Sequence, residues 1–195
     1  MDNLIKTPQS LSKKIWLFIL DIAQTFVVTG IVFFFITYFF FRPFQVSGNS
    51  MYSNFKDREY ILTNLISLRF SNPIRGDVVV FKSPSDSKKD FIKRIIAVPG
   101  DEILIDNGEV SLNGRILKES YLDEGMKTFG GAFLQEGIKK TVPNGYFFVM
   151  GDNRNDSSDS RTWGFITRES IKGISFFVYW PLNEVQIIKN PYDEE

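Results

Sequence analysis

Apolar residues dominate the amino-terminal part of the chain and then give way to short apolar runs separated by polar turns. From Ala23 to Phe41 no side chain is charged. As a helix, this stretch would span roughly 28 Å, close to the ~30 Å hydrocarbon core of a bilayer. Apolar residues at 15–20 extend the pattern upstream. We therefore expect a transmembrane anchor helix over residues 15–42, preceded by a tail at residues 1–14.

Two other interpretations of this segment stay open, a cleavable secretory signal and a buried core helix. Against a cleavable signal, the apolar region is long and ends in Phe39-Phe40-Phe41-Arg42-Pro43, without small residues for cleavage. Lys6, Lys13 and Lys14 precede the span, and the positive-inside rule then places the tail in the cytoplasm. The chain from residue 43 to residue 195 would lie outside the cytoplasm.

Beyond Pro43 the apolar runs are short, as in strands. Asn107-Gly108 and Asn113-Gly114 separate three of these runs, and Asn-Gly favours hairpin turns because both positions need positive φ. Residues 119–142 form a less regular insertion. The expected fold class is mostly β, with an all-β domain at 43–195 after the helix. The predicted strands cover residues 77–81, 91–98, 102–106, 109–112, 115–117, 146–150 and 174–180.

The chain has no histidine and no cysteine. This excludes Ser-His-Asp and Cys-His catalysis, imidazole and thiolate metal sites, and disulfides, and we expect neither a metal nor a cofactor. Basic and acidic residues balance at 23 each, so no net charge favours nucleic acid as a partner. Any proton transfer near neutral pH must use a carboxylate, a lysine, a tyrosine or the amino terminus.

Lys93 stands inside an apolar strand-like run, where alternation places it on one face with Phe91 and Ile95. One interpretation is that its stem lies along the sheet edge and its amine reaches water. The other is burial, which favours the neutral amine and would let it take the proton of a serine hydroxyl. Ser50, after Gly48-Asn49, is a candidate serine, although a serine near a glycine is more often part of a turn.

The polar run Gly151 to Gly164 follows a predicted strand. It is either a solvated turn or an ordered loop whose hydroxyl and charged groups bond to one another. Four shorter segments precede this run in the chain: Pro43-Phe44-Gln45-Val46, Arg75 to Phe81, Phe91-Ile92-Lys93-Arg94 and Pro99-Gly100-Asp101. Together, and in this order, the four segments and the polar run resemble the type I signal peptidases. These are membrane serine proteases that remove signal peptides from exported proteins.

The resemblance implies roles for several residues. Ser50 would be the nucleophile, Lys93 the general base, and the Ser50 amide an oxyanion donor, with the Gly48 amide as a second donor. Ser157 would orient the lysine amine, while an Asp159–Arg161 ion pair, Asp152 and Arg154 would support the site. Small substrate side chains, in the pattern Ala-X-Ala, would meet walls formed by Phe44, Val46, Met51, Val80 and Ile92.

The same resemblance implies a single-pass protein of the cytoplasmic (inner) membrane whose partners are signal peptides, the lipid bilayer and the secretion translocon. Three alternatives remain: an inactive relative that binds signal peptides, a soluble Ser/Lys protease of the self-cleaving repressor kind, and an unrelated anchored β-domain. The chain also departs from the family pattern after Met51, where Tyr52-Ser53-Asn54-Phe55 replaces the usual X-Pro-Thr-Leu.

Overall fold

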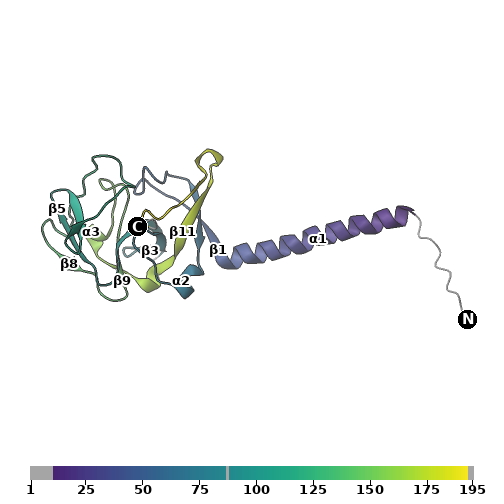
Figure 1. Cartoon of the computed structure of the whole chain (residues 1–195), viewed down its shortest axis with the longest axis horizontal. Helices are drawn as coiled ribbons and strands as arrows, with labels where there is room; N and C mark the ends of the chain where they lie inside the picture. Colours follow the sequence, from purple (N-terminus) through teal and green to yellow (C-terminus); the bar gives the residue numbers. More distant parts are fainter. Residues whose placement is uncertain (1–10, 87, 193–195) are drawn as a thin grey trace, which may run out of the picture. The chain divides into compact units, whose positions relative to one another are not determined.

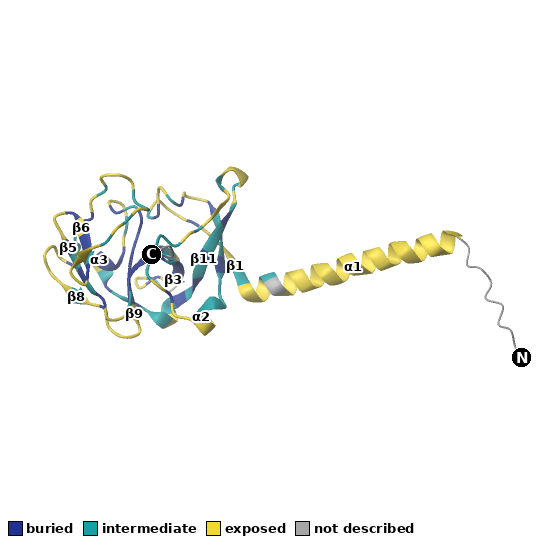
Figure 2. Cartoon of the chain, viewed as in Figure 1, coloured by how far each residue is buried: buried dark blue, intermediate teal, exposed yellow. Residues whose placement is uncertain are grey.

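The computed structural model describes residues 11–86 and 88–192 (Figure 1). The chain divides into two compact units, one ending at Phe39 and one beginning at Phe40. The first contains nearly all of helix α1 (Leu11–Phe40), whose described side chains are exposed except that of Thr37, which is half-buried (Figure 2). By length and composition α1 is the one described helix that could cross a membrane, and none of its most apolar 18-residue window is buried.

The structure corrects the expected boundaries of this helix. Residues 11–14, assigned above to the tail, are helical, and residues 1–10 lie outside the described part of the chain. Residues 41 and 42, assigned to the helix, belong instead to strand β1 (Phe41–Gln45). The cause of the earlier end is Pro43, whose ring disfavours the α conformation of the residue before it.

The described residues form two sheets, and the larger one has eight strands in the order β1-β2-β11-β3-β4-β9-β10, with β12 paired to β11. All of these pairs are antiparallel. In addition to β1, the strands are β2 (Tyr60–Asn64), β3 (Val78–Lys82), β4 (Asp90–Ala97), β9 (Tyr146–Met150), β10 (Ile166–Thr167), β11 (Ile171–Trp180) and β12 (Gln186–Ile187).

The second sheet has the order β7-β6-β5-β8. Its two hairpin turns have positive φ at both positions, 54° and 85° at Asn107-Gly108 and 53° and 79° at Asn113-Gly114, so the Asn-Gly prediction is confirmed. No strand is assigned between residues 117 and 139, in agreement with a less regular insertion, although its end forms β8. The strands are β5 (Glu102–Asp106), β6 (Glu109–Leu112), β7 (Arg115–Ile116) and β8 (Lys140–Thr141).

Short helices connect the strands, and the described unit from residue 40 onward is mostly β, as predicted. These helices are α2 (Ser67–Phe70), α3 (Ser160–Trp163), η1 (Arg168–Ser170) and η2 (Leu182–Glu184). One of three buried apolar clusters joins the ends of β1 and β2 to β3 and β11, and it supports the residues described next. Its members are Val46, Met51, Phe55, Ile61, Val78, Val80 and Val178.

Candidate active site

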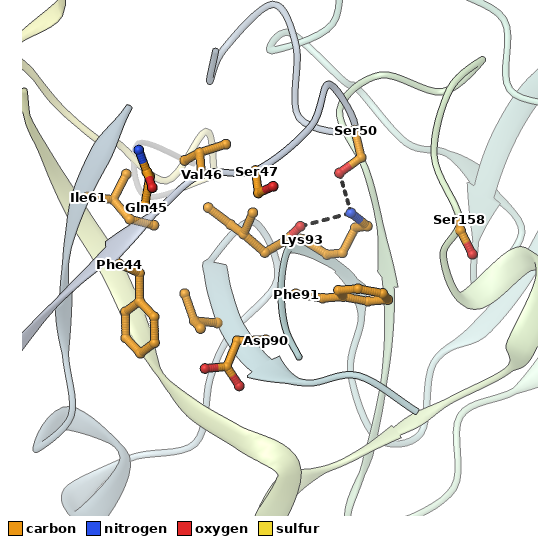
Figure 3. A pocket seen from close by; sticks show the side chains of 12 residues that line it. Phe44, Gln45, Val46, Ser47, Ser50, Ile61, Asp90, Phe91, Lys93 and Ser158 are labelled. Atoms are coloured by element: carbon orange, nitrogen blue, oxygen red, sulfur yellow. Dashed lines mark hydrogen bonds between the residues drawn. The ribbon is translucent and has the colours of Figure 1, made fainter. Parts of the chain in front are cut away.

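Ser50 and Lys93 meet in the larger sheet. Lys93 is the fourth residue of β4, and Ser50 lies in the turn that follows β1. The Lys93 Nζ donates a hydrogen bond to Ser50 Oγ and a second one, of 3.0 Å, to the carbonyl oxygen of Ile92 (Figure 3). The Lys93 side chain is only 4% exposed. Of the two interpretations of this lysine, burial is therefore correct.

Burial is also the main reason that the pKa of Lys93 falls from 10.5 to about 8. The carboxylates of Asp159 and Asp152 oppose this change, and the guanidinium of Arg161 adds to it. With a pKa near 8, roughly a fifth of the amines are neutral at pH 7.4, compared with about one in a thousand for an unperturbed lysine. The site therefore holds a substantial population of a base bonded to a hydroxyl.

A cavity of about 210 Å³ opens beside this pair, between the end of β1 and the first residues of β4 (Figure 3). Four of the residues expected to contact substrate line it: Phe44, Val46, Val80 and Ile92. The sequence did not indicate the other lining residues, because they come from several segments whose meeting depends on the fold. They are Gln45, Ser47, Ile61, Asp90, Phe91 and Ser158.

Two expected roles need correction. Met51 does not line the cavity, because the turn after Ser50 buries its side chain completely in the apolar cluster with Val46 and Val80. The amide of Gly48, expected as a second oxyanion donor, already donates to Asp57 Oδ1 at 2.8 Å. A bonded amide is not available to an oxyanion in this conformation.

The polar loop after β9 is ordered by its own side chains. Asp159 and Arg161 form a buried bidentate ion pair, with both nitrogen–oxygen distances at 2.8 Å. Asp159 also accepts from the amide of Gly151 at 3.1 Å and from the amide of Arg161 at the start of α3. The interpretation of this run as a solvated turn is therefore wrong.

Ser157 does not make the bond expected of it. Its Oγ is buried and has no hydrogen-bond partner among the described residues, whereas the Lys93 amine is bonded to Ser50 Oγ and to the Ile92 carbonyl. Ser157 nevertheless lies close to the site, because a side chain at Gly151 would collide with both Ser157 Oγ and the Ser50 carbonyl oxygen. In this conformation the Ile92 carbonyl orients the amine.

Asp152 and Arg154 belong to two different buried ion pairs. Asp152 accepts from Arg94 Nε at 2.9 Å and Nη2 at 2.7 Å. Arg154 pairs with Glu119 of the irregular segment and also donates to the Gly151 carbonyl at 3.0 Å. The sequence offered no signal for Glu119, which lies 35 residues before its partner. Arg94 was not predicted as a site residue either, although its position next to Lys93 in the sequence indicated that it lies near the site.

A buried amine bonded to a serine hydroxyl, beside a small apolar cavity in a β-domain, defines a serine hydrolase with lysine as the candidate base. Within residues 11–86 and 88–192 there is no group of three or more acidic, histidine or cysteine side chains that could hold a metal ion. The chemistry that these residues offer is proton transfer and nucleophilic attack.

Comparison with known proteins narrows this class. Residues 19–180 match the family described as signal peptidase, peptidase S26. A probable signal peptidase I-2 of Synechocystis is 33% identical over 97% of this chain and 85% of its own length. A signal peptidase I of Bacillus amyloliquefaciens is 35% identical over 88% and 93%, and a signal peptidase IB of Staphylococcus aureus is 32% identical over 93% and 97%.

The chain therefore belongs to the signal peptidase family, peptidase S26, and is a serine peptidase, as the resemblance in sequence implied. A crystal structure of a signal peptidase I from Enterococcus faecalis is 30% identical in sequence and aligns with a TM-score of 0.45. That alignment covers 53% of this chain and 97% of the crystallised one.

Proposed function

We propose that this protein is a membrane-bound endopeptidase that cleaves amino-terminal signal peptides from exported preproteins, with Ser50 as nucleophile and neutral Lys93 as general base. The bond between the buried Lys93 amine and Ser50 Oγ is the observation that carries the proposal. Family membership and the names of the relatives, each a signal peptidase I type, support the substrate.

The reaction then proceeds in two halves. Ser50 Oγ attacks the scissile carbonyl carbon while Lys93 Nζ takes the hydroxyl proton, and the resulting oxyanion accepts from the Ser50 amide. The C–N bond breaks as the lysine ammonium returns its proton to the leaving amine. Water attacks the ester carbonyl while Lys93 Nζ takes one of its protons. The lysine ammonium then returns that proton to Ser50 Oγ as the bond between Oγ and the acyl carbon breaks, and the acid product leaves. Ser157 Oγ, which is buried and has no hydrogen-bond partner in the described part of the chain, is a candidate to accept from the ammonium.

The cavity supports a preference for small side chains at alternate positions of an extended substrate. Its volume of about 210 Å³ is below the ~300–1,000 Å³ of typical ligand pockets. Phe44 and Val46 come from the β1 side, and Ile92 from β4. Residues 90–93 of β4 pair with β3 on one side, and the paired residues on the β9 side begin at Arg94. A peptide backbone could therefore pair along this edge.

The exposed apolar helix α1 supports a membrane anchor, since it is long enough to cross a bilayer and its side chains need an apolar environment. The lysines before it favour a cytoplasmic amino terminus and an extracytoplasmic site. We place the protein in the cytoplasmic membrane, in a single pass, with the lipid bilayer and the secretion translocon as its partners there.

The test is cleavage of a signal-peptide substrate carrying Ala-X-Ala by the detergent-solubilised full-length protein, with the cut located by mass spectrometry. We expect one cut after the second alanine, and no cut with Ser50→Ala or Lys93→Met. A matched control is Ser85→Ala, a serine of a surface loop whose hydroxyl contacts Ser83, which should retain full activity. Cleavage by Ser50→Ala at the wild-type rate would remove the proposed mechanism.

A further inference from the structure

Asn153 holds two successive carbonyl groups of the turn that carries the nucleophile. Its backbone amide donates to the Ser50 carbonyl oxygen at 3.1 Å, and its side-chain Nδ2 donates to the Asn49 carbonyl oxygen, also at 3.1 Å. The Asn49 carbonyl oxygen accepts a further bond from the amide of Tyr52 at 3.0 Å. One peptide group, the one between Asn49 and Ser50, is thus held firmly by its oxygen.

Fixing that oxygen also fixes the direction of the Ser50 N–H. The Asn49–Ser50 peptide bond is trans, since the cis bonds of the described chain lie elsewhere. In a planar trans peptide the C=O and the N–H point in opposite directions. The Ser50 N–H therefore points away from Asn153, and no described residue accepts a hydrogen bond from it. The Ser50 N–H is therefore a hydrogen-bond donor whose direction is fixed, and it lies beside the serine hydroxyl.

The orientation of the Asn153 side chain is itself determined by a neighbour. Its Oδ1 accepts from the amide of Asp156 at 3.2 Å, which leaves Nδ2 to face the Asn49 carbonyl. The reversed side-chain amide would place two oxygens together at Asn49 and two donors together at Asp156. Asn153 also follows Asp152 directly, so the buried ion pair with Arg94 anchors the segment from which it reaches the turn.

We propose that Asn153 is a positioning residue that aims the Ser50 amide at the oxyanion of the tetrahedral intermediate. The inference rests on the function proposed above and identifies which residue prepares its oxyanion site. The amide of Gly48 is occupied by Asp57, so the Ser50 N–H carries a large share of the oxyanion stabilisation. Loss of one oxyanion donor typically lowers kcat by roughly 10²–10³-fold, and loss of its alignment should give part of that effect.

The test is Asn153→Asp in the detergent-solubilised full-length protein. The substitution keeps the shape and the acceptor for Asp156 but turns a carboxylate oxygen toward the Asn49 carbonyl. We expect kcat to fall roughly 10–100-fold while KM stays within about twofold. The affinity for a peptide aldehyde, whose adduct with Ser50 resembles the intermediate, should fall by the same factor as kcat.

The matched control is Asn155→Asp, which adds the same charge two residues away. Among the described residues the one hydrogen bond of the Asn155 Nδ2 goes to Met126 Sδ, at 3.5 Å, so kcat and aldehyde affinity should remain at the wild-type level. The pH at which activity is half-maximal should stay unchanged in Asn153→Ser, which adds no charge near Lys93, because Lys93 is not its target. A thermal unfolding curve verifies the fold, and Asn153→Ser, which removes the donor without adding charge, serves if the aspartate variant does not fold.

Three results would overturn the inference: an unchanged kcat and aldehyde affinity in Asn153→Asp, an effect on KM alone, or a shifted pH midpoint in Asn153→Ser, which would indicate a disturbed lysine. Asn155→Asp as damaging as Asn153→Asp would also overturn it, because charge alone would then explain the loss. An active Asn153→Asp beside an inactive Ser50→Ala would remove this inference and leave the proposed function standing. An active Ser50→Ala would instead remove the proposed function.

Discussion

Lys93 combines burial, a bond to a hydroxyl and a pKa of about 8, so the fraction of neutral base should change within the pH range where peptidase activity is measured. Below pH 8 we expect kcat/KM to rise about tenfold per pH unit, and above pH 8 it should level off. A profile from pH 5.5 to 9.5 on a peptide substrate measures this. A midpoint near 10, the value of an exposed lysine, would show that burial does not activate the amine.

The same pKa affects folding stability. In the unfolded chain Lys93 binds its proton up to about pH 10.5, whereas in the folded chain it releases it near pH 8. Between these values the unfolded state binds more protons, so stability rises with pH there, and below pH 8 the full penalty of about 3 kcal/mol is present.

Lys93→Met should therefore abolish activity yet stabilise the protein at pH 6, by up to about 3 kcal/mol. This advantage should shrink as the pH rises from 8 toward 10.5. Urea unfolding of the detergent-solubilised chain, followed by tryptophan fluorescence at pH 6 and pH 10, measures both quantities. Equal stabilities of variant and wild type at pH 6 would mean that the amine carries no penalty in the fold.

At the scale of elements, the buried ion pair between Arg94 of β4 and Asp152 after β9 joins two strands behind the site. Their side chains are 4% and 1% exposed. Asp152→Asn should cost about 3–5 kcal/mol of unfolding free energy, because it leaves the Arg94 charge buried and unpaired. Denaturant unfolding at pH 7 measures the loss.

The comparable surface pair is Lys139–Glu102, with side chains 55% and 39% exposed. Glu102→Gln removes the same charge from an exposed position and should cost less than about 1 kcal/mol. If the two substitutions cost the same, the Arg94–Asp152 pair would not hold the strands together in the way that its burial indicates.

Strands that depend on local pattern were predictable, and those that depend on distant partners were not. β5, β6 and β9 have the predicted bounds, because each is an apolar run ended by turn residues. The first two residues of β1, Phe41 and Arg42, were assigned to the membrane helix, because Phe41 continues its apolar run. Their strand conformation depends on pairing with β2 about twenty residues later. β8, β10 and β12 have two residues each, too few for a pattern.

The residues of the candidate site also divide into some that could be predicted from local sequence and some that could not. Ser50 and Lys93 could be named as candidates from their short segments, and the family resemblance implied the Asp159–Arg161 pair. Glu119, the partner of Arg154, could not, because a single glutamate in an irregular segment has no periodicity to indicate its contacts. Met51 was misplaced for a related reason: being next to Ser50 in sequence does not determine which face of the turn a side chain occupies.

At the scale of the whole molecule, every residue of the candidate site lies in the unit that begins at Phe40. A chain lacking residues 1–39 should therefore fold and cleave a short soluble peptide with a kcat within a few-fold of the full-length protein. It should no longer sediment with lipid vesicles, whereas the full-length chain should. Peptide assays test the expected activity, and vesicle co-sedimentation tests the expected loss of lipid binding. An unfolded truncated chain would show that α1 is needed for folding.

The edge of β4 at residues 90–93, paired with β3 on one side, has a consequence for turnover. A substrate backbone that pairs along that edge makes the same hydrogen bonds before and after the scissile bond is cut. The amino-terminal fragment left after cleavage should therefore stay bound at the edge. We expect a rapid first turnover followed by a slower steady state set by departure of that fragment, and competitive inhibition when it is added in excess. In a cell, prompt removal of spent fragments by another protease would then keep the enzyme free for new preproteins.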